Sequence, residues 1–181
     1  MKTILIAIMG LFLIKGEKTL FDFGTPENSG DWKIVNDGVM GGLSKSDWVL
    51  NPDGTATFKG IVSLENNGGF ASVRTFVAPL DRDHFKGVKV RVKGDGNWYN
   101  IRFRTDRNFD GYAYQAKIKT DKGNWKEHAI PFEDFKPTFR GNTLKNKPAL
   151  ESKNISQIGI LISDKQAGNF KLILDWIKYY K

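Results

Sequence analysis

Residues 98–105 read WYNIRFRT, and their apolar and polar side chains alternate. Every second residue from Tyr99 to Phe103 is apolar, whereas the intervening positions from Asn100 to Arg104 are polar. Successive side chains of a β-strand point to opposite faces, so this period of two predicts a strand with one buried and one wet face. The stretch therefore predicts a sheet that packs on a core through one side only.

Other segments repeat this pattern between turn signals. Residues 88–93 read VKVRVK, and residues 155–162 are almost continuously apolar, as in a strand at the centre of a sandwich. Near the end of the sequence, four large apolar side chains are expected to share one face: Phe170, Leu172, Leu174 and Trp176. Turn-forming clusters recur at residues 51–55, 66–69, 94–97, 120–124 and 165–169. No window has a helical apolar stripe, and residues 135–153 are expected to form a long connection. The pattern predicts an all-β fold, an antiparallel β-sandwich.

Composition excludes several classes of function. The 181 residues contain no cysteine, which excludes disulfides, thiol catalysis and cysteine-based metal sites. The net charge is +8, but basic residues are interleaved with acidic ones and form no run. Nucleic-acid-binding arms and polybasic membrane patches are clustered, so we expect neither partner.

The first sixteen residues resemble a secretory signal. A basic start at Lys2 precedes an apolar stretch that ends at Ile14, and this stretch is too short to span a membrane. We therefore expect residues 1–16 to be a signal peptide, residues 17–181 to form a single binding domain, and the protein to be exported to the periplasm or cell exterior. The alternative is an uncleaved first strand or short helix in an intracellular protein.

Two glycine-rich blocks carry a family resemblance. Residues 35–44 read VNDGVMGGLS and residues 65–74 read ENNGGFASVR. Together with residues 94–96, 131–132, 139–141 and 168–170, they resemble the complex I intermediate-associated protein 30 family over about residues 20–179. The resemblance implies a galactose-binding-domain-like jelly roll, similar to carbohydrate-binding modules. Mitochondrial members of that family assist the assembly of respiratory complex I.

The two blocks supply the first candidate binding surface. Glycine-rich loops turn sharply and let a partner approach the backbone closely. The candidate residues are Asn36, Asp37, Met40, Gly41, Gly42, Asn67, Gly68, Gly69 and Arg74. A purely structural alternative has Asn36 and Asp37 capping a turn while Met40 fills the core. We also expect Arg74 to pair with Asp37, because an arginine among aromatic residues needs a carboxylate or carbonyl partner.

The polar face of residues 98–105 supplies the second candidate surface. Side-chain donors there, with a stacking ring, are typical of sugar recognition on a sheet, and the candidates are Trp98, Asn100, Arg102, Arg104 and Gln115. Tyr112 and Tyr114 are alternative sources of the ring. An ordinary solvent-facing strand is the simpler reading of the same pattern.

No nucleophile–base set or metal-ligand spacing is present in the sequence, so we expect no catalytic residue, no metal and no cofactor. The sequence predicts a non-catalytic, monomeric binding module. Its partner is a protein, as the family resemblance implies, or alternatively a glycan bound on the sheet face.

Overall fold

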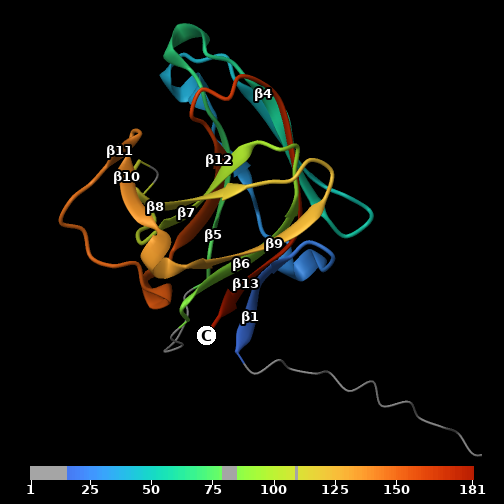
Figure 1. Ribbon diagram of the computed structural model, residues 1–181, viewed down its shortest axis with the longest axis vertical. Helices are drawn as coiled ribbons and strands as arrows, with labels where there is room; N and C mark the ends of the chain where they lie inside the picture. The colour runs from blue at the N-terminus through green and yellow to red at the C-terminus, as the bar shows by residue number, and fades with distance from the viewer. Residues whose placement is uncertain (1–15, 79–84, 109) are drawn as a thin grey trace, which may run out of the picture.

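The computed structural model describes residues 16–78, 85–108 and 110–181. They form two stacked β-sheets with short 3-10 turns between strands (Figure 1). Every pairing between the strands of the described part is antiparallel. The predicted antiparallel β-sandwich is therefore confirmed.

The first sheet has six strands. Its order is β3 (Lys45–Leu50), β4 (Ala56–Val62), β13 (Gly168–Tyr180), β6 (Gly87–Lys93) and β9 (Trp125–Pro131), with β1 (Glu17–Asp22) also paired to β13. The long β13 pairs with β4 through its first half and with β1 through its second half. Along most of its length it also pairs with β6. One strand therefore joins three others into a sheet.

The second sheet has seven strands. Its order is β11 (Asn142–Thr143), β10 (Lys136–Phe139), β8 (Ala113–Lys119), β7 (Trp98–Arg104), β12 (Gln157–Ile162), β5 (Ala71–Phe76) and β2 (Lys33–Ile34). Five 3-10 turns complete the described elements: η1 (Pro26–Asn28), η2 (Asp37–Met40), η3 (Glu65–Asn67), η4 (Phe132–Asp134) and η5 (Ser152–Asn154).

The hydrophobic core lies between the two sheets, and the period-two pattern predicts which side chains reach it. Tyr99, Ile101 and Phe103 of β7 are fully buried, as are the three valines of β6. All six residues of β12 are buried, because β7 and β5 flank this strand on both sides. These three predictions are confirmed.

The alternation of β13 changes phase at a β-bulge, which corrects one expectation. Leu172 and Leu174 are buried, but the register shifts between Leu174 and Trp176, and Ile177 is buried in its place. Trp176 is only partly buried and does not share the core face. A bulge inserts one residue into one strand and so exchanges the two faces beyond it.

The expected long connection over residues 135–153 is also corrected. It contains β10 and β11, which extend the second sheet beyond β8, and the turn η5. Pro137 is tolerated in β10 because this short strand lies near the edge of the sheet. Fifteen of the sixteen residues of the expected signal peptide lie outside the described residues. Among the described residues, no helix has the length and apolarity needed to cross a membrane.

Candidate functional site

The side chain of Asp37 connects the two glycine-rich blocks. It is fully buried, and its Oδ1 accepts a hydrogen bond of 2.9 Å from the Ser44 backbone N–H. Its Oδ2 accepts backbone N–H bonds from Gly69 at 2.7 Å and Phe70 at 3.1 Å, together with one from the Ser44 hydroxyl. Four donors therefore surround one carboxylate, and two of them come from a segment more than thirty residues away in the sequence.

The electrostatics of this carboxylate follow from its donors. Burial alone would raise the pKa of Asp37, because it disfavours the charged form. The hydrogen bonds from Ser44, Gly69 and Phe70 outweigh burial and hold the pKa below its ordinary value. The side chain is therefore an anion at neutral pH, and it fixes the geometry of both blocks.

Glycines make room for this carboxylate. A Cβ on Gly42 would lie 2.4 Å from the Cγ of Asp37, and a Cβ on Gly68 would lie 2.7 Å from its Oδ2. Gly41 and Gly69 have φ values of +87° and +130°, which L side chains rarely adopt. The glycines of both blocks thus serve the packing and turning of the backbone around Asp37.

Asn36 makes a second connection between the blocks. Its Oδ1 accepts hydrogen bonds from the Ser46 hydroxyl at 2.8 Å and from the Ser72 backbone N–H at 3.2 Å. The Ser72 hydroxyl in turn donates to the carbonyl of Val35. Both side chains therefore serve the fold, as the structural alternative expected. They do not cap a turn, because Asn36 makes no capping hydrogen bond to η2 and the contacts of both residues reach other segments.

The expected pair between Asp37 and Arg74 is wrong. Asp37 is satisfied by Ser44 and by backbone N–H groups, whereas Arg74 lies on β5 near Arg104. Burial, followed by the nearby charge of Arg104, lowers the pKa of Arg74 to about 10. The link between the two blocks exists, but backbone donors make it.

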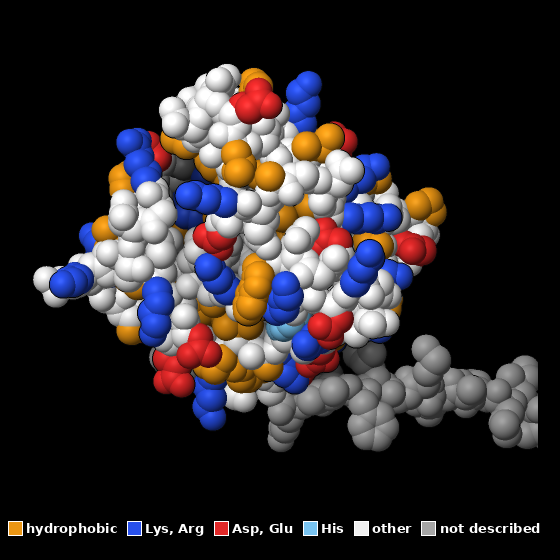
Figure 2. Space-filling model, turned by 45° about the horizontal axis from the view of Figure 1, so that its top comes forward, with side chains coloured by type: hydrophobic (Ala, Val, Ile, Leu, Met, Phe, Trp, Pro, Cys, Tyr) orange, Lys and Arg blue, Asp and Glu red, His pale blue; other side chains and the backbone are white. Residues whose placement is uncertain are grey.

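Exposed apolar side chains surround these loops at one end of the sandwich, which we call the tip. The five residues of the tip are Val39, Met40, Ile61, Leu64 and Leu43, and between 45% and 67% of each is exposed. The expectation that Met40 fills the core is wrong, because 58% of this residue is exposed. The turns η2 and η3 meet at the top of Figure 1, and hydrophobic side chains reach the surface near this end in Figure 2.

A shallow hollow adjoins the tip. Ile61, Leu64 and Glu65 line it, together with Ala167, which directly precedes β13. Ser63, between these residues, donates its backbone N–H to the Ser44 hydroxyl at 3.0 Å. The hollow and the exposed side chains of the tip therefore rest on backbone that the Asp37 contacts hold in place.

The second candidate surface is the outer face of the second sheet, where the structure brings Trp98, Asn100, Arg102, Arg104 and Gln115 together on β7 and β8. Asn100 is fully buried, and its Nδ2 donates to the Leu161 carbonyl at 3.5 Å and to the Ser163 hydroxyl at 3.4 Å. Its amide therefore serves the protein's own structure.

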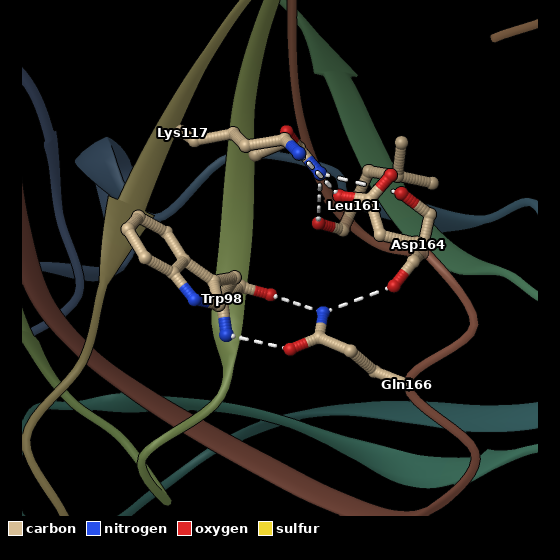
Figure 3. A network of polar contacts seen from close by, with 7 residues as sticks. Trp98, Lys117, Leu161, Asp164 and Gln166 are labelled. Carbon is tan, nitrogen blue, oxygen red and sulfur yellow. Dashed lines mark hydrogen bonds and ion pairs between the residues drawn. The ribbon is translucent and has the colours of Figure 1, made fainter.

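A polar network surrounds Trp98 at the start of β7 (Figure 3). The Gln166 side chain accepts from the Trp98 N–H at 2.9 Å and donates to the Trp98 carbonyl at 2.9 Å. Lys117 pairs with Asp164 at 2.8 Å beside it. Gln166 thus acts as a further strand partner for the end of β7, a role that the sequence analysis missed.

Aromatic rings on the face lie under cations. The indole of Trp98 is partly exposed, but Lys119 Nζ lies 5.3 Å from its ring centroid. Phe76 is 48% exposed, and the Arg107 guanidinium lies 4.3 Å from its centroid. The alternative ring of Tyr114 is buried. Both exposed rings therefore have one face occupied by a cation.

Arginines gather at the centre of the face. Arg102 on β7 and Arg74 on β5 are both opposite Gly159 of β12, which lies between them. Burial, then the charges of Arg104 and Arg74, lowers the pKa of Arg102 to about 10, so it stays charged at pH 7. No sequence signal marked Gly159 as the residue between the two arginines, because its position depends on strand register.

Other chemistry has little support in the described part of the chain. No three His, Cys, Asp or Glu side chains there gather in a way that would hold a metal ion. Figure 2 shows Lys and Arg side chains spread over the visible face and interleaved with Asp and Glu. The site thus consists of two surfaces, the apolar tip and the arginine-bearing sheet face.

Comparison with solved structures supports the jelly-roll fold. The family 11 carbohydrate-binding module from Clostridium thermocellum, in complex with a β-1,3-1,4-mixed-linked tetrasaccharide, aligns with a TM-score of 0.67 and 20% identity. The alignment covers 91% of this chain and 95% of that module. The agarase AgWH50C aligns with a TM-score of 0.59 and 13% identity, over 92% of this chain and 25% of the agarase. At these identities the likeness establishes the fold alone.

Comparison with sequences gives the family. Complex I intermediate-associated protein 30 of Neurospora crassa is 26% identical over 88% of this chain and 72% of its own length. The probable Caenorhabditis elegans protein of that name is 27% identical, over 99% of this chain and 58% of its own length. The Mus musculus protein is 24% identical, over 91% of this chain and 56% of its own length. This chain thus spans little more than half of the last two relatives.

These relatives correct the expected location. All three are named as mitochondrial proteins, which contradicts export to the periplasm or cell exterior. The model of the family described as complex I intermediate-associated protein 30 matches residues 21–174, which include both glycine-rich blocks and most strands of both sheets. The chain therefore belongs to the complex I intermediate-associated protein 30 family.

Proposed function

We propose that the protein is a non-catalytic binding module that holds a protein partner during the assembly of a respiratory complex I. The names of its relatives support this kind of task. The exposed apolar tip supports the mode of binding, and it is the observation that carries the proposal. Scattered exposed apolar residues are common, whereas a group of them at one end of a fold is typical of an interaction surface.

The tip is suited to binding because its backbone is fixed before a partner arrives. Asp37 holds the start of η2 and the residues after η3 through four hydrogen bonds. Val39 and Met40 therefore project from an ordered turn. A preorganised surface loses little conformational entropy on association, so more of the apolar burial contributes to affinity.

The contacts on the sheet face favour a protein partner over a neutral glycan. Sugars bind to protein modules by stacking on open aromatic rings, but Trp98 and Phe76 each carry a cation over one face. Asn100, the amide expected to bind a sugar hydroxyl, is buried and donates to groups of the protein itself. Glycan binding stays a prediction based on the sheet face alone.

A matched pair of variants tests the proposal. Leu43→Asp places a charge on the tip, whereas Leu50→Asp places the same charge on a leucine of similar exposure at the far end of the β3–β4 hairpin. Each variant replaces the native protein in its source organism, and native gels followed by detection of the protein report its association with complex I intermediates.

We expect the wild type and Leu50→Asp to migrate with an assembly intermediate and Leu43→Asp to migrate alone, with less mature complex I formed. Association of all three proteins to the same extent would remove the tip from the proposal. Absence of the wild type from every complex I intermediate would overturn the proposed function itself.

A further inference from the structure

Three lysines lie beside the apolar tip on the outer face of the first sheet. Strand register places Lys45 of β3 directly opposite Ile61 of β4, and Lys59 lies two residues before Ile61 on the same face. Lys171 of β13 lies opposite Lys59. We call these three lysines the lysine patch. Residues that face one another on neighbouring strands are about 5 Å apart, and residues two apart on one strand are about 7 Å apart, so the lysine patch adjoins the tip.

The lysine patch has an excess of positive charge. All three lysines are exposed, and none of them forms an ion pair with a residue that the structure describes. Two acids lie nearby: Asp47 is opposite Lys59, and Asp95 accepts a hydrogen bond of 2.7 Å from the Lys171 backbone N–H. Three lysines and two acids leave a net charge of +1 at this part of the sheet.

The tip and the lysine patch together form one surface with two kinds of chemistry. The shallow hollow lined by Ile61 and Leu64 can receive apolar side chains, and the lysines next to Ile61 can receive carboxylates. An amphipathic helix carries apolar side chains along one stripe and charged side chains beside that stripe. Carboxylates one turn apart on such a helix are about 5–6 Å apart, within reach of two flexible lysine side chains. The surface therefore matches a helix that is apolar on one face and acidic on the flank.

A lipid bilayer matches this surface less well. Glu65 directly follows Leu64, is exposed and lines the same hollow. Insertion of the tip into a bilayer would carry this carboxylate toward the hydrocarbon region, which costs free energy. Anionic headgroups would also repel it. A protein segment avoids both costs, because it can leave Glu65 in contact with water.

We propose that the partner segment held by the tip is an acidic amphipathic helix, with apolar side chains in the hollow beside Ile61 and Leu64 and with carboxylates paired to Lys45 and Lys59. This inference rests on the proposed function, since it names the part of the partner that the tip binds. Burial of apolar surface supplies most of the affinity. The exposed ion pairs contribute mainly to the rate and the specificity of association.

Two fluorescein-labelled peptides test the inference by fluorescence anisotropy with the purified full chain. Each has about fifteen residues, with leucines along one face and a hydrocarbon staple on the opposite face that keeps it helical. The positions beside the leucines are glutamate in the first peptide and glutamine in the second. Lys45→Gln/Lys59→Gln removes two charges from the lysine patch. Lys122→Gln/Lys145→Gln is the matched control, because it removes two exposed charges from the turn after β8 and the segment after β11.

We expect the wild type to bind the glutamate peptide about fivefold more tightly than the glutamine peptide. Lys45→Gln/Lys59→Gln should abolish this difference and leave the affinity for the glutamine peptide unchanged, whereas the control pair should preserve it. Leu43→Asp should weaken binding of both peptides. Equal losses in the two lysine pairs would show diffuse charge attraction, and equal binding of both peptides by the wild type would show that acid is not recognised. Either result would overturn the inference, as would the absence of binding by both peptides.

Sedimentation with vesicles of phosphatidylcholine and phosphatidylglycerol tests the bilayer as the other occupant. Vesicle binding that Leu43→Asp abolishes would assign the tip to a membrane and overturn the helix. Failure of the inference is distinct from failure of the proposed function. If Leu43→Asp loses complex I intermediates while Lys45→Gln/Lys59→Gln keeps them and neither peptide binds, the proposed function stands without the acidic helix. Peptide binding by a protein that is absent from every intermediate has the opposite meaning. Thermal unfolding confirms that each variant is folded.

Discussion

Gly42 lies directly against the carboxylate of Asp37: a Cβ on Gly42 would be 2.4 Å from Cγ and 2.5 Å from Oδ1. Real side chains do not approach so closely, so any other residue at position 42 must displace the carboxylate. That displacement would break hydrogen bonds from Ser44, Gly69 and Phe70 together. The hydrogen bonds that join the two glycine-rich blocks thus depend on one close contact within the first block.

Gly42→Ala should therefore lower the free energy of unfolding by about 2–4 kcal/mol, since buried donors lose their acceptor. Gly38→Ala is the control in the same loop, because its Cβ would meet nothing within 4 Å and its φ is not in the left-handed region. Urea unfolding measures both variants. Equal losses in Gly38→Ala and Gly42→Ala would show that the contact with Asp37 is not the cause.

Asp37→Asn should change how stability depends on pH. The folded-state pKa of Asp37 lies below its unfolded value, so its ionised form stabilises the fold above the unfolded pKa. This stabilisation is lost as the pH falls through the folded-state pKa. The difference between wild type and Asp37→Asn should be large at neutral pH and should shrink below about pH 4.

Asp47→Asn controls for the change in net charge, because Asp47 is exposed on β3. Urea unfolding across the acid range supplies the comparison. A constant difference between wild type and Asp37→Asn at every pH would mean that the amide replaces the carboxylate without an ionic contribution.

Arg102→Leu should raise the free energy of unfolding by about 1 kcal/mol, because it removes a like charge and a buried unpaired N–H. The same substitution at Arg91 should lower it. Arg91 pairs with Asp175 and lies 4.8 Å from the ring centroid of Trp125. Thermal unfolding of both variants gives opposite shifts if the two arginines differ as described. A loss of stability in Arg102→Leu would assign this side chain a structural role.

Gln166→Ala should loosen the end of β7. The Gln166 amide bonds to both the N–H and the carbonyl of Trp98, so its loss should accelerate hydrogen exchange at Trp98 by about fivefold to tenfold. The amide of Ile101, in the middle of the same strand, is the internal reference. Acceleration at both amides would indicate that the whole strand is destabilised.

Strands were predictable from sequence wherever the side chains alternate cleanly. β6 and β7 have valines or large apolar residues at every second position, so their buried faces could be read directly. The bulge in β13 could not be predicted. Ile173 and Ile177 lie at odd positions and Trp176 at an even one, so apolar side chains occur on both faces of the expected strand. The hydrophobic pattern alone does not fix register under these conditions.

The candidate surfaces were less predictable than the strands. Asp37 was singled out, but its main partners are backbone N–H groups, which every residue except proline possesses and no sequence motif reveals. The grouping of Arg74 and Arg102 on one sheet face depends on the pairing of strands that are far apart in the sequence. Arg74 and Arg102 could be identified as candidates, but the glycine between them follows only from the three-dimensional register.

The position of β13 has a consequence for synthesis of the protein. This strand connects β1, β4 and β6, and its final residues pair with the first residues of β1. A ribosome makes the chain from the N-terminus, so β1, β4 and β6 emerge long before the strand that joins them. The first sheet cannot close until residue 180 has left the exit tunnel, and until then its unpaired edges are open to aggregation and to chaperones.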